Sequence, residues 1–265
     1  TYTPKIIFPK LNLSNSKLID NILEEVGIEL SVGGLLQNLI INFDTSKEIL
    51  KANIQDLEIS NNSMDLKGLV GKLSIYKGKG ELALNSPFIR ASSSDFLDKD
   101  LQFYAFNSLL NFSYSNKKFE INPSSFNSIL DNEEIEGLLS FVNIPTKGLG
   151  DINLRLRSKR MNDKSALSFF PNTAYLSSTK EGIDLLIDSA LFEDLNLIYR
   201  GPLDGIYTDN SSSFAMQASG RDISLNVNGY KILSANADLS LNNFILNGPI
   251  NNHNFTIYSY FDVLC

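Results

Sequence analysis

Apolar and polar residues alternate along most of this chain, so the dominant period of its hydrophobic pattern is two. The alternation is clearest in ten runs: Leu57/Ile59, Leu73/Ile75, Leu82/Leu84, Leu110/Phe112/Tyr114, Phe119/Ile121, Ile152/Leu154/Leu156, Leu195/Leu197/Tyr199, Phe214/Met216/Ala218, Ile223/Leu225/Val227 and Leu239/Leu241. A period of two places successive side chains on opposite faces of an extended strand. The pattern therefore predicts many strands, each with one buried and one solvated face.

Short polar and glycine-rich segments separate these runs. They fall at residues 61–63, 77–80, 115–118, 148–151, 209–213, 228–229 and 247–249. Asn, Gly, Asp and Ser favour tight turns, and strands joined by tight turns pair antiparallel with their neighbours. We therefore expect a mainly β fold built as one long, strongly curved antiparallel meander.

Two segments follow a helical period instead. Residues 16–26 carry apolar side chains on one helical face and are followed by Gly27, a good helix stop. Ser178 stands three residues before Glu181, which is the spacing of a capping box, and Ile183, Leu186, Ile187 and Ala190 then share one face. The sequence thus predicts two short amphipathic helices that cap or plug the sheet.

The same pattern suggests three parts to the chain. Residues 1–47 form an N-terminal segment with a short helix, 48–160 a first stretch of curved sheet, and 161–265 a second stretch with a short helix near 179–190. If about 18 strands lay side by side at about 4.8 Å, the sheet would be of the order of 80 Å long. Such a sheet is too long for a compact domain of this size, and two short helices cannot cover its apolar face.

Composition excludes several classes of site. The 265 residues include one cysteine, one histidine and no tryptophan, so a zinc site built from Cys and His or a disulfide framework cannot form. The formal net charge of -7 repels phosphate backbones, which argues against nucleic acid as a partner. We expect no metal, no cofactor and no catalytic residue.

Two features could still carry acid–base chemistry. Glu133, Glu134 and Glu136 could pair as carboxylates, but Glu134 and Glu136 fall two apart where a strand begins, so we expect both on its solvated face. His253 lies in a polar run and is expected to be a turn residue.

Two further motifs have simple structural interpretations. Gly78-Lys79-Gly80 has the first half of a phosphate-binding glycine loop, but a strand follows it rather than a helix, so we expect a hairpin turn. The run Arg155, Arg157, Lys159 and Arg160 could touch anionic headgroups or an anionic partner. Its alternating spacing favours a solvated strand face whose charges discourage edge-to-edge pairing.

No apolar run is long enough to be a membrane-spanning helix. The strongest, residues 33–41, is interrupted by Gln37 and Asn38. The chain begins at Thr1 without a recognisable signal peptide and ends at Cys265, expected to be an unpaired thiol, inside an apparent strand. We therefore expect a segment of a longer protein.

The order of strands and turns resembles the YhdP branch of the AsmA-like proteins. One stretch reads as a strand at 52–59, the glycine pattern of 65–74 and a further strand from Gly78 to Leu84. A second stretch has Phe170-Pro171-Asn172, an apolar segment at 185–191, the Gly201-Pro202-Leu203 turn after a strand, and then a pair of strands at 213–218 and 223–230. The resemblance extends from about Gly33 to about Gly248.

The resemblance implies a large envelope protein of Gram-negative bacteria. Members of this family are anchored in the inner membrane, extend through the periplasm and form a long apolar groove in which phospholipid acyl chains move between the inner and outer membranes. It therefore implies a periplasmic location, phospholipid and the two membranes as partners, and no enzymatic activity.

An apolar sheet face that lacks a covering layer is consistent with that mechanism, because acyl chains could supply the cover. The residues expected to line the groove are Leu82, Leu84, Phe103, Leu110, Phe112, Phe119, Ile121, Ile152, Leu154, Leu225 and Val227. Two alternatives stay open at this point. One is a structural or adhesive β-rich surface module with a closed core, and the other is a glycosidase that uses two carboxylates.

Overall fold

The computed structural model describes residues 5–14, 31–43, 49–60, 64–93, 97, 99–115, 118–143, 150–169, 187–202, 213–227, 230–242, 245–250 and 253–258. The strands are β1 (Lys5–Asn12), β2 (Ser31–Asn42), β3 (Leu50–Ser60), β4 (Met64–Tyr76), β5 (Lys79–Ser93), β6 (Leu101–Ser115), β7 (Lys118–Leu130), β8 (Glu133–Asn143), β9 (Asp151–Asn162), β10 (Ile187–Pro202), β11 (Ser213–Val227), β12 (Tyr230–Asn242), β13 (Ile245–Ile250) and β14 (His253–Tyr258). A short helix, α2 (Asp163–Leu167), follows β9.

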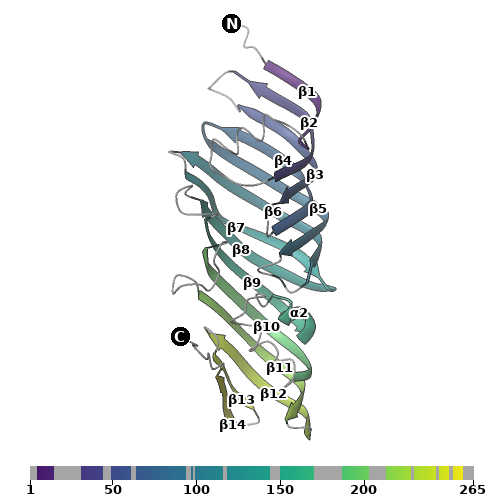
Figure 1. Ribbon diagram of the computed structural model, residues 1–265, viewed down its shortest axis with the longest axis vertical. Helices are drawn as coiled ribbons and strands as arrows, with labels where there is room; N and C mark the ends of the chain where they lie inside the picture. The colour runs from purple at the N-terminus through teal and green to yellow at the C-terminus, as the bar shows by residue number, and fades with distance from the viewer. Residues whose placement is uncertain are drawn as a thin grey trace, which may run out of the picture.

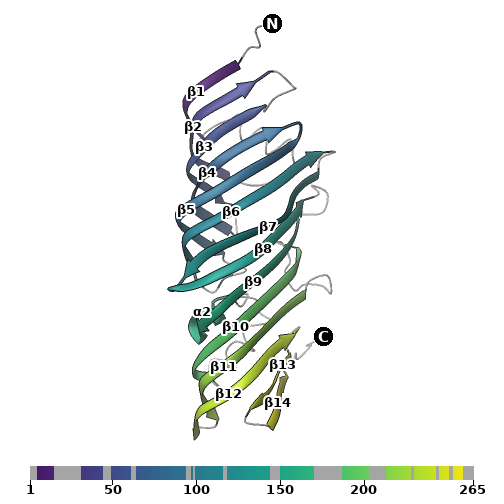
Figure 2. The ribbon, with the colours of Figure 1, turned by 180° about the vertical axis from the view of Figure 1, so that it is seen from behind.

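All fourteen strands belong to one antiparallel sheet in which the order in space is the order in sequence. β1 and β14 lie at opposite ends of its long axis, and the sheet is not closed on itself (Figure 1). The strands bend as they cross the sheet, so the sheet is curled rather than flat (Figure 2). The predicted fold class, one long curved antiparallel meander, is confirmed. The described strands number fourteen rather than about 18, so the sheet is of the order of 60 Å long at the usual strand spacing.

Two of the tight turns show why neighbouring strands pair in this register. Lys77 and Gly78 join β4 to β5, and Asp131 and Asn132 join β7 to β8, with positive φ angles at all four residues. Two central residues with positive φ are typical of the type I′ hairpin, whose twist matches that of paired strands. Gly, Asn and Asp tolerate this conformation well.

Five residues other than glycine inside the described strands also have positive φ, where a strand normally requires extended backbone. They are Asn38, Asp56, Ala105, Asp194 and Asp222, with φ between 49° and 52°. The register of the adjacent strand pair shifts at each of them. These residues therefore form β-bulges, which bend a strand and increase its local twist.

The residue after each bulge returns an apolar side chain to the buried face. Leu39, Leu57, Leu195 and Ile223 follow four of the bulges, and all are buried. Without the bulge, simple alternation would point the apolar residues beyond it to the opposite face. The bulges thus bend the strands while keeping one face apolar along their whole length.

Polar side chains satisfy backbone groups that the bulges release from the ladder. Asn107 Nδ2 donates to the Ala105 carbonyl at 2.8 Å, and Asn196 Nδ2 donates to the Asp194 carbonyl at 2.9 Å. The buried Ser128 hydroxyl donates to the Tyr104 carbonyl at 2.8 Å, beside the same Ala105 bulge. A buried backbone group without a partner would cost about 1–3 kcal/mol, so these contacts stabilise the bends.

Replacing Ala105 by glycine is expected to raise the free energy of unfolding by about 0.5–1 kcal/mol, because glycine adopts a φ of 50° without the steric cost that alanine bears. Ala83→Gly, in a regular part of β5, should instead lower it by a similar amount, because only the entropic cost of glycine remains. Urea unfolding midpoints of the two variants measure both changes. Equal destabilisation by both substitutions would contradict the proposed bulge conformation.

Buried side chains form two clusters on one face of the sheet, which we call the inner face. The first cluster contains Leu36, Ile54, Leu69, Leu84 and Ile89 from the N-terminal half of the sheet, and the second contains Leu130, Ile135, Leu156, Leu195 and Tyr199 from the remainder. Phe103 packs against both clusters and so joins them.

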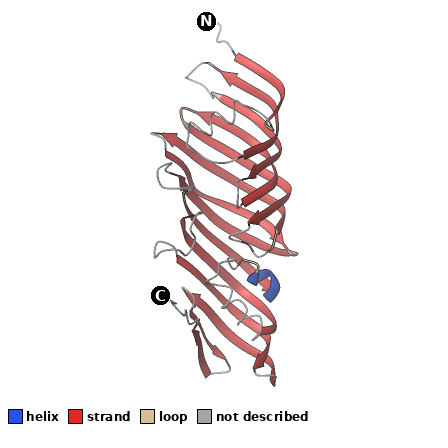
Figure 3. Ribbon diagram, in the orientation of Figure 1, coloured by secondary structure: helices blue, strands red, loops and turns tan. Residues whose placement is uncertain are grey.

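The helix α2 lies on the inner face at one edge of the sheet, beside the ends of β9 and β10 (Figure 3). Asn162 caps it, because its side chain accepts a hydrogen bond from the Ser165 backbone amide at 2.9 Å. Ala166 and Phe169 are buried against the second cluster. This five-residue helix was not predicted from the hydrophobic pattern, although Asn162-Asp163 is a typical helix start.

Four local predictions were wrong or fall outside the described residues. The end of the helix predicted near 179–190 is a strand, because Ile187 and Ala190 belong to β10, while the helix predicted at 16–26 lies outside the described residues. The two strands predicted at 213–218 and 223–230 are one strand, β11, up to Val227, because the Asp222 bulge interrupts the alternation without ending the strand. Residues 247–249, predicted as a turn, lie inside β13.

The predicted division of the chain at residues 160/161 falls inside β9, and strand pairing continues across it. Pairing also continues from β2 to β3, on either side of the division at 47/48.

Candidate functional site

One position in each of the fourteen strands contributes to a continuous row across the inner face. The register pairs these positions strand by strand, and we call the set the apolar row: Leu11, Leu36, Ile54, Gly71, Leu84, Ser108, Phe126, Gly137, Leu156, Leu197, Met216, Leu241, Leu246 and Ile257. Every member is apolar or small, and none is charged. For the members with described side chains, Leu11 to Met216, the inner face therefore has an uncharged path that runs perpendicular to the strands from β1 to β11, and strand register alone continues the row to β14.

Nine of the eleven residues predicted to line a groove lie on the inner face. Leu84 belongs to the apolar row, and Leu82, Phe103 and Leu110 pack with it against the first cluster. Ile152 and Leu154 pack against the second cluster. Phe112, Phe119 and Ile121 complete the nine and are half-buried near the opposite edge of the sheet from α2. For Leu225 and Val227 the structure describes only backbone positions in β11.

Three phenylalanine rings on this face lie close to glycines in or next to neighbouring strands. A Cβ atom added at Gly80 would lie 2.0 Å from the Phe112 ring, and one added at Gly137 would lie 2.3 Å from the Phe126 ring. At Gly150, directly before β9, an added Cβ would lie 2.9 Å from the Phe141 ring and 2.5 Å from the Val142 carbonyl oxygen. A ring that lies flat over a glycine fills the missing side-chain volume, which makes this part of the face smooth rather than ridged.

Phe126 and Phe141 were not among the predicted lining residues. Phe126 stacks on Phe106 with ring centroids 5.7 Å apart, and Phe141 lies 6.3 Å from Phe119, which in turn lies 5.7 Å from Phe112. The available signal was the pairing of a bulky residue with a cross-strand glycine, which requires the register and cannot be read from one strand alone.

The two edges of the inner face differ in how well they are covered. Beside α2, Met161, Phe192 and Leu195 are almost completely buried. At the other edge Phe112, Phe119, Phe141 and Ile152 are only half-buried. Among the described residues, the apolar surface is thus closed on the α2 side and partly accessible on the opposite side.

Tyr199 adds a phenol to the buried part of this face. Burial raises its pKa well above the usual range, and the nearby Asp151 carboxylate raises it further. The hydroxyl therefore stays neutral at physiological pH, so Tyr199 adds no charge to the inner face.

The opposite face, which we call the outer face, has a polar row in matching register. It comprises Asn85, Asn107, Asn127, Glu136, Arg157, Asn196 and Gln217, and it continues through the positions of Ser240, Asn247 and Thr256. Asn107 Nδ2 donates to Asn127 Oδ1 at 3.3 Å. Arg157 lies 3.8 Å from Glu136 and 3.6 Å from Asp194, between their carboxylate oxygens. One face is thus suited to apolar material and the other to water.

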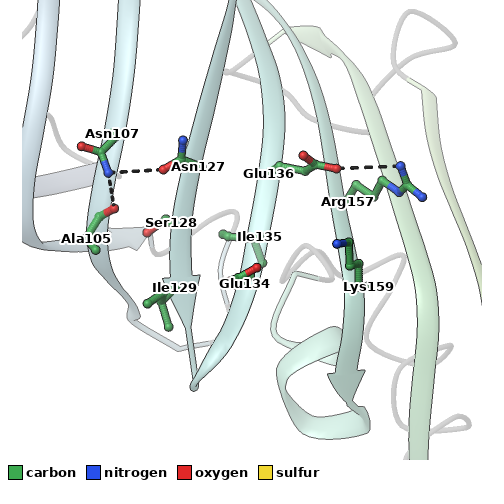
Figure 4. Close-up of a pocket in the computed structure, with 10 residues that line it drawn as sticks. All are labelled: Ala105, Asn107, Asn127, Ser128, Ile129, Glu134, Ile135, Glu136, Arg157 and Lys159. Carbon is green, nitrogen blue, oxygen red and sulfur yellow. Dashed lines mark hydrogen bonds and ion pairs between the residues drawn. The ribbon is translucent and has the colours of Figure 1, made fainter.

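A shallow depression of about 360 Å³ lies on this outer face (Figure 4). Glu134, Glu136, Arg157 and Lys159 line it together with the amides of Asn107 and Asn127. Glu134 and Glu136 are exposed on the solvated face, as predicted from their spacing. Of these carboxylates, Glu136 lies 3.8 Å from Arg157.

The remaining candidate features from the sequence are a metal site, the glycine loop at Gly78, His253 and Cys265. Within the described residues, no group of three or more His, Cys, Asp and Glu side chains could hold a metal ion. Gly78 lies in the predicted hairpin turn, whereas His253, predicted as a turn residue, is the first residue of β14. Cys265 lies outside the described residues.

The basic run on β9 is exposed, but the reason given from sequence was wrong. Arg155, Arg157 and Lys159 point to the outer face, and Arg160 follows a local irregularity in which the Ser158 hydroxyl donates to the Arg160 carbonyl at 2.7 Å. β9 pairs with both β8 and β10, so it is an interior strand and needs no charges to prevent edge pairing.

The described part of the chain has no helix that is both long enough and apolar enough to cross a membrane. Comparison of the chain with protein-family models, with curated proteins and with solved structures found no match. The resemblance to the AsmA-like proteins therefore stays a prediction that rests on the sequence pattern.

Proposed function

We propose that this protein binds phospholipid acyl chains on its inner face and conducts them passively along the apolar row. The observation that carries this proposal is the apolar row of an open sheet, whose described side chains are uncharged from β1 to β11 and whose register continues to β14. Following the family resemblance, the chain would be a periplasmic part of an inner-membrane-anchored protein, and the lipids would pass between the inner and outer bacterial membranes.

The geometry suits sliding more than tight capture. Burial of each methylene contributes about 0.8 kcal/mol, so an acyl chain gains several kcal/mol on an apolar surface of this length. Because successive strands offer similar apolar contacts about 4.8 Å apart, much of that free energy is retained as the chain moves from strand to strand. The flat rings of Phe112 and Phe126 over Gly80 and Gly137 reduce the steric barrier to this movement.

The polar row supports the same proposal from the other face. A two-faced sheet in water must cover its apolar side, and the strip around Phe112 and Phe119 is only half-buried. Acyl chains would complete that cover, while Asn107, Asn127 and Arg157 keep the outer face solvated. No covalent step is needed for such transport, so the proposal includes no enzymatic activity.

The second candidate is a structural or adhesive β-rich module with a closed core. The fully buried residues beside α2, such as Met161 and Leu195, favour it because they already form an ordinary core. The two candidates differ at the other edge, where Phe112 and Phe119 would contact lipid in one and only protein in the other.

Photo-crosslinking can distinguish lipid conduction from a β-rich module with a closed core. A photoreactive phenylalanine analogue replaces Phe119 on the inner face, and a control protein carries it in place of Tyr104 on the outer face. After incubation with vesicles of labelled phospholipid, the inner probe is expected to capture lipid and the outer probe is not. Equal labelling at the two positions, or no labelling at either, would exclude conduction along the inner face.

Phe112→Asp is expected to lower lipid capture at position 119 by about tenfold or more, because a carboxylate would then stand beside the acyl path. The protein should stay folded, since Phe112 is only half-buried. Leu109→Asp is the matched control, because it lies in the same strand with its side chain exposed on the outer face. Capture is normalised to the folded fraction measured by circular dichroism, and unchanged capture by folded Phe112→Asp protein would refute the path.

A further inference from the structure

The hairpin edge of the sheet that lies opposite α2 is rich in lysine. Lys51, Lys77, Lys79 and Lys118 stand at or beside the ends of β3, β4, β5 and β7 on this edge, and we call them the lysine rim. Strand pairing places them in succession along the edge, since Tyr76 pairs with Lys79 and Lys118 pairs with Ser115. In a chain whose net charge is -7, this is a local excess of positive charge.

The carboxylates near the rim do not cancel it. From β3 to β8, the described residues close to this edge include Glu81 and Glu120 against the four lysines, and Glu120 forms an ion pair with Lys118. Lys77 and Lys79 are both exposed. Among the described residues from β3 to β8, this edge therefore carries more lysines than carboxylates.

At the opposite edge of the sheet, the described negative charges outnumber the positive ones. Over the same strands its described charged residues are Glu58, Asp65, Lys67, Arg90, Lys99, Asp100, Asp131, Glu133 and Glu134, so carboxylates outnumber cations two to one. Two of those cations are already paired: Lys67 lies 3.0 Å from Asp65, and Arg90 forms an ion pair with Asp100. The hydrogen bond from Lys67 to Asp65 raises the pKa of that lysine, as expected for a paired cation.

Tyrosines accompany the lysines at the rim. Tyr76 and Tyr114 are exposed there, and Lys77 Nζ lies 5.1 Å from the centre of the Tyr76 ring. Tyrosine and lysine are the residues that stabilise protein surfaces at the level of lipid headgroups, because each joins an apolar body to a polar tip.

The rim also borders the accessible part of the inner face. Ile75, Gly80 and Phe112 are paired across β4, β5 and β6, next to the Lys77-Gly78 turn. An acyl chain over Phe112 would place the head of its lipid within reach of the flexible lysine side chains. At the other edge α2 lies beside β9 and β10, and Leu101 and Leu130 of the second cluster are buried near the ends of β6 and β7.

We propose that the lysine rim binds lipid headgroups whose phosphate charge is not offset by a cationic group, and so gives the protein a preference for anionic phospholipids. This inference rests on the proposed function and adds to it the edge along which headgroups travel and the class of headgroup preferred. Each lysine near an anionic lipid surface contributes an attraction that salt weakens within a Debye length.

The test compares two kinds of vesicle, one of phosphatidylglycerol and one of phosphatidylcholine, with the photoreactive analogue at position 119. The full chain is expected to capture the anionic lipid about fivefold to tenfold more efficiently at low salt. About 0.5 M sodium chloride should remove most of that preference. Capture of neither lipid would refute the proposed function, whereas equal capture of both would refute only the preference.

Two double variants test whether the rim lysines cause the preference for anionic lipid. Lys77→Asn with Lys79→Gln removes two rim charges, and asparagine preserves the turn because it tolerates the positive φ of residue 77. Lys72→Gln with Lys159→Gln removes two exposed charges from the outer face as a matched control. The first pair should abolish the preference and the second should leave it intact. If both double variants lost the preference for anionic lipid, or if neither did, the preference could not be assigned to the rim.

Inorganic phosphate distinguishes a lipid headgroup site from a site for free phosphate. If the rim recognises headgroups only as part of a lipid, millimolar phosphate at constant ionic strength should leave capture of phosphatidylglycerol unchanged. Competitive loss of capture would identify the rim as a general phosphate site and overturn the headgroup assignment.

Discussion

Leu195→Asp is expected to unfold this protein or to lower its free energy of unfolding by more than about 4 kcal/mol. Leu195 is fully buried, directly after the Asp194 bulge, in the cluster that joins the inner face to α2. A carboxylate at this position would have no cation on the inner face to pair with among the described members of the cluster. Loss of the leucine also leaves a cavity, which adds to the cost.

Leu138→Asp makes the same chemical change on the outer face and should have almost no effect. Leu138 is 48% exposed, and it lies in β8 on the face that carries Glu136 and Arg157. Urea unfolding followed by circular dichroism compares the two variants directly. If Leu138→Asp were as damaging as Leu195→Asp, the outer face would also be covered, and the division of the sheet into one apolar and one solvated face would be wrong.

The alternating pattern was sufficient to predict which face of each strand is buried. Leu82 and Leu84, Phe119 and Ile121, and Ile152 and Leu154 are pairs two residues apart, and each pair lies on the inner face. The period of two follows directly from extended backbone geometry, so it does not depend on the partner strand. Together with the turn residues, it was enough to predict an antiparallel meander.

The bulges could not be predicted because they break that period without ending the strand. At Asp222 the apolar positions change from even to odd numbers, so β11 resembled two strands in the sequence. Asp and Asn tolerate positive φ and are also common in turns, which makes a bulge inside a strand indistinguishable from a turn by residue type. Ala105 gives even less signal, since alanine has no preference for this conformation.

The prediction of a helix near 179–190 was wrong at its C-terminal end because the hydrophobic pattern there is also ambiguous. Ile187 and Ala190 fit a helical spacing, but Ala190 is also buried in β10, where Phe192 continues an alternating pattern. A short apolar run satisfies both periods, and pairing with β9 and β11 decides in favour of the strand.

The lining of the candidate site was predictable in part. Strand alternation identified Phe112 and Phe119, whereas Phe126 and Phe141 belong to the same surface through pairing with glycines of other strands. The lysine rim depends on register in the same way, because its members are far apart in the sequence. Long-range pairing thus determines the features that bear most directly on the proposed function.

Gly34→Ala is expected to lower the free energy of unfolding by about 2–4 kcal/mol, which is unusually large for the addition of one methyl group. Gly34 has φ of +107°, and an added Cβ would lie 2.4 Å from the Asp56 carbonyl oxygen and 2.8 Å from the Leu57 Cα. Both contacts are to backbone, so no side chain can rotate away. The substitution would push β2 from β3 at the point where the Asp56 bulge brings the two strands closest.

Gly33→Ala, one residue earlier, provides the control for this steric argument. Its added Cβ would meet only the Ser14 hydroxyl at 3.2 Å and the Glu58 side chain at 3.6 Å, and its φ lies outside the range that favours glycine. It should therefore be neutral or stabilise the protein by up to about 1 kcal/mol, because alanine restricts the unfolded chain. Thermal and urea unfolding of the two variants measure the difference. Similar stabilities would mean that β2 and β3 do not approach closely at Gly34, which would remove the physical basis for the bend at this end of the sheet.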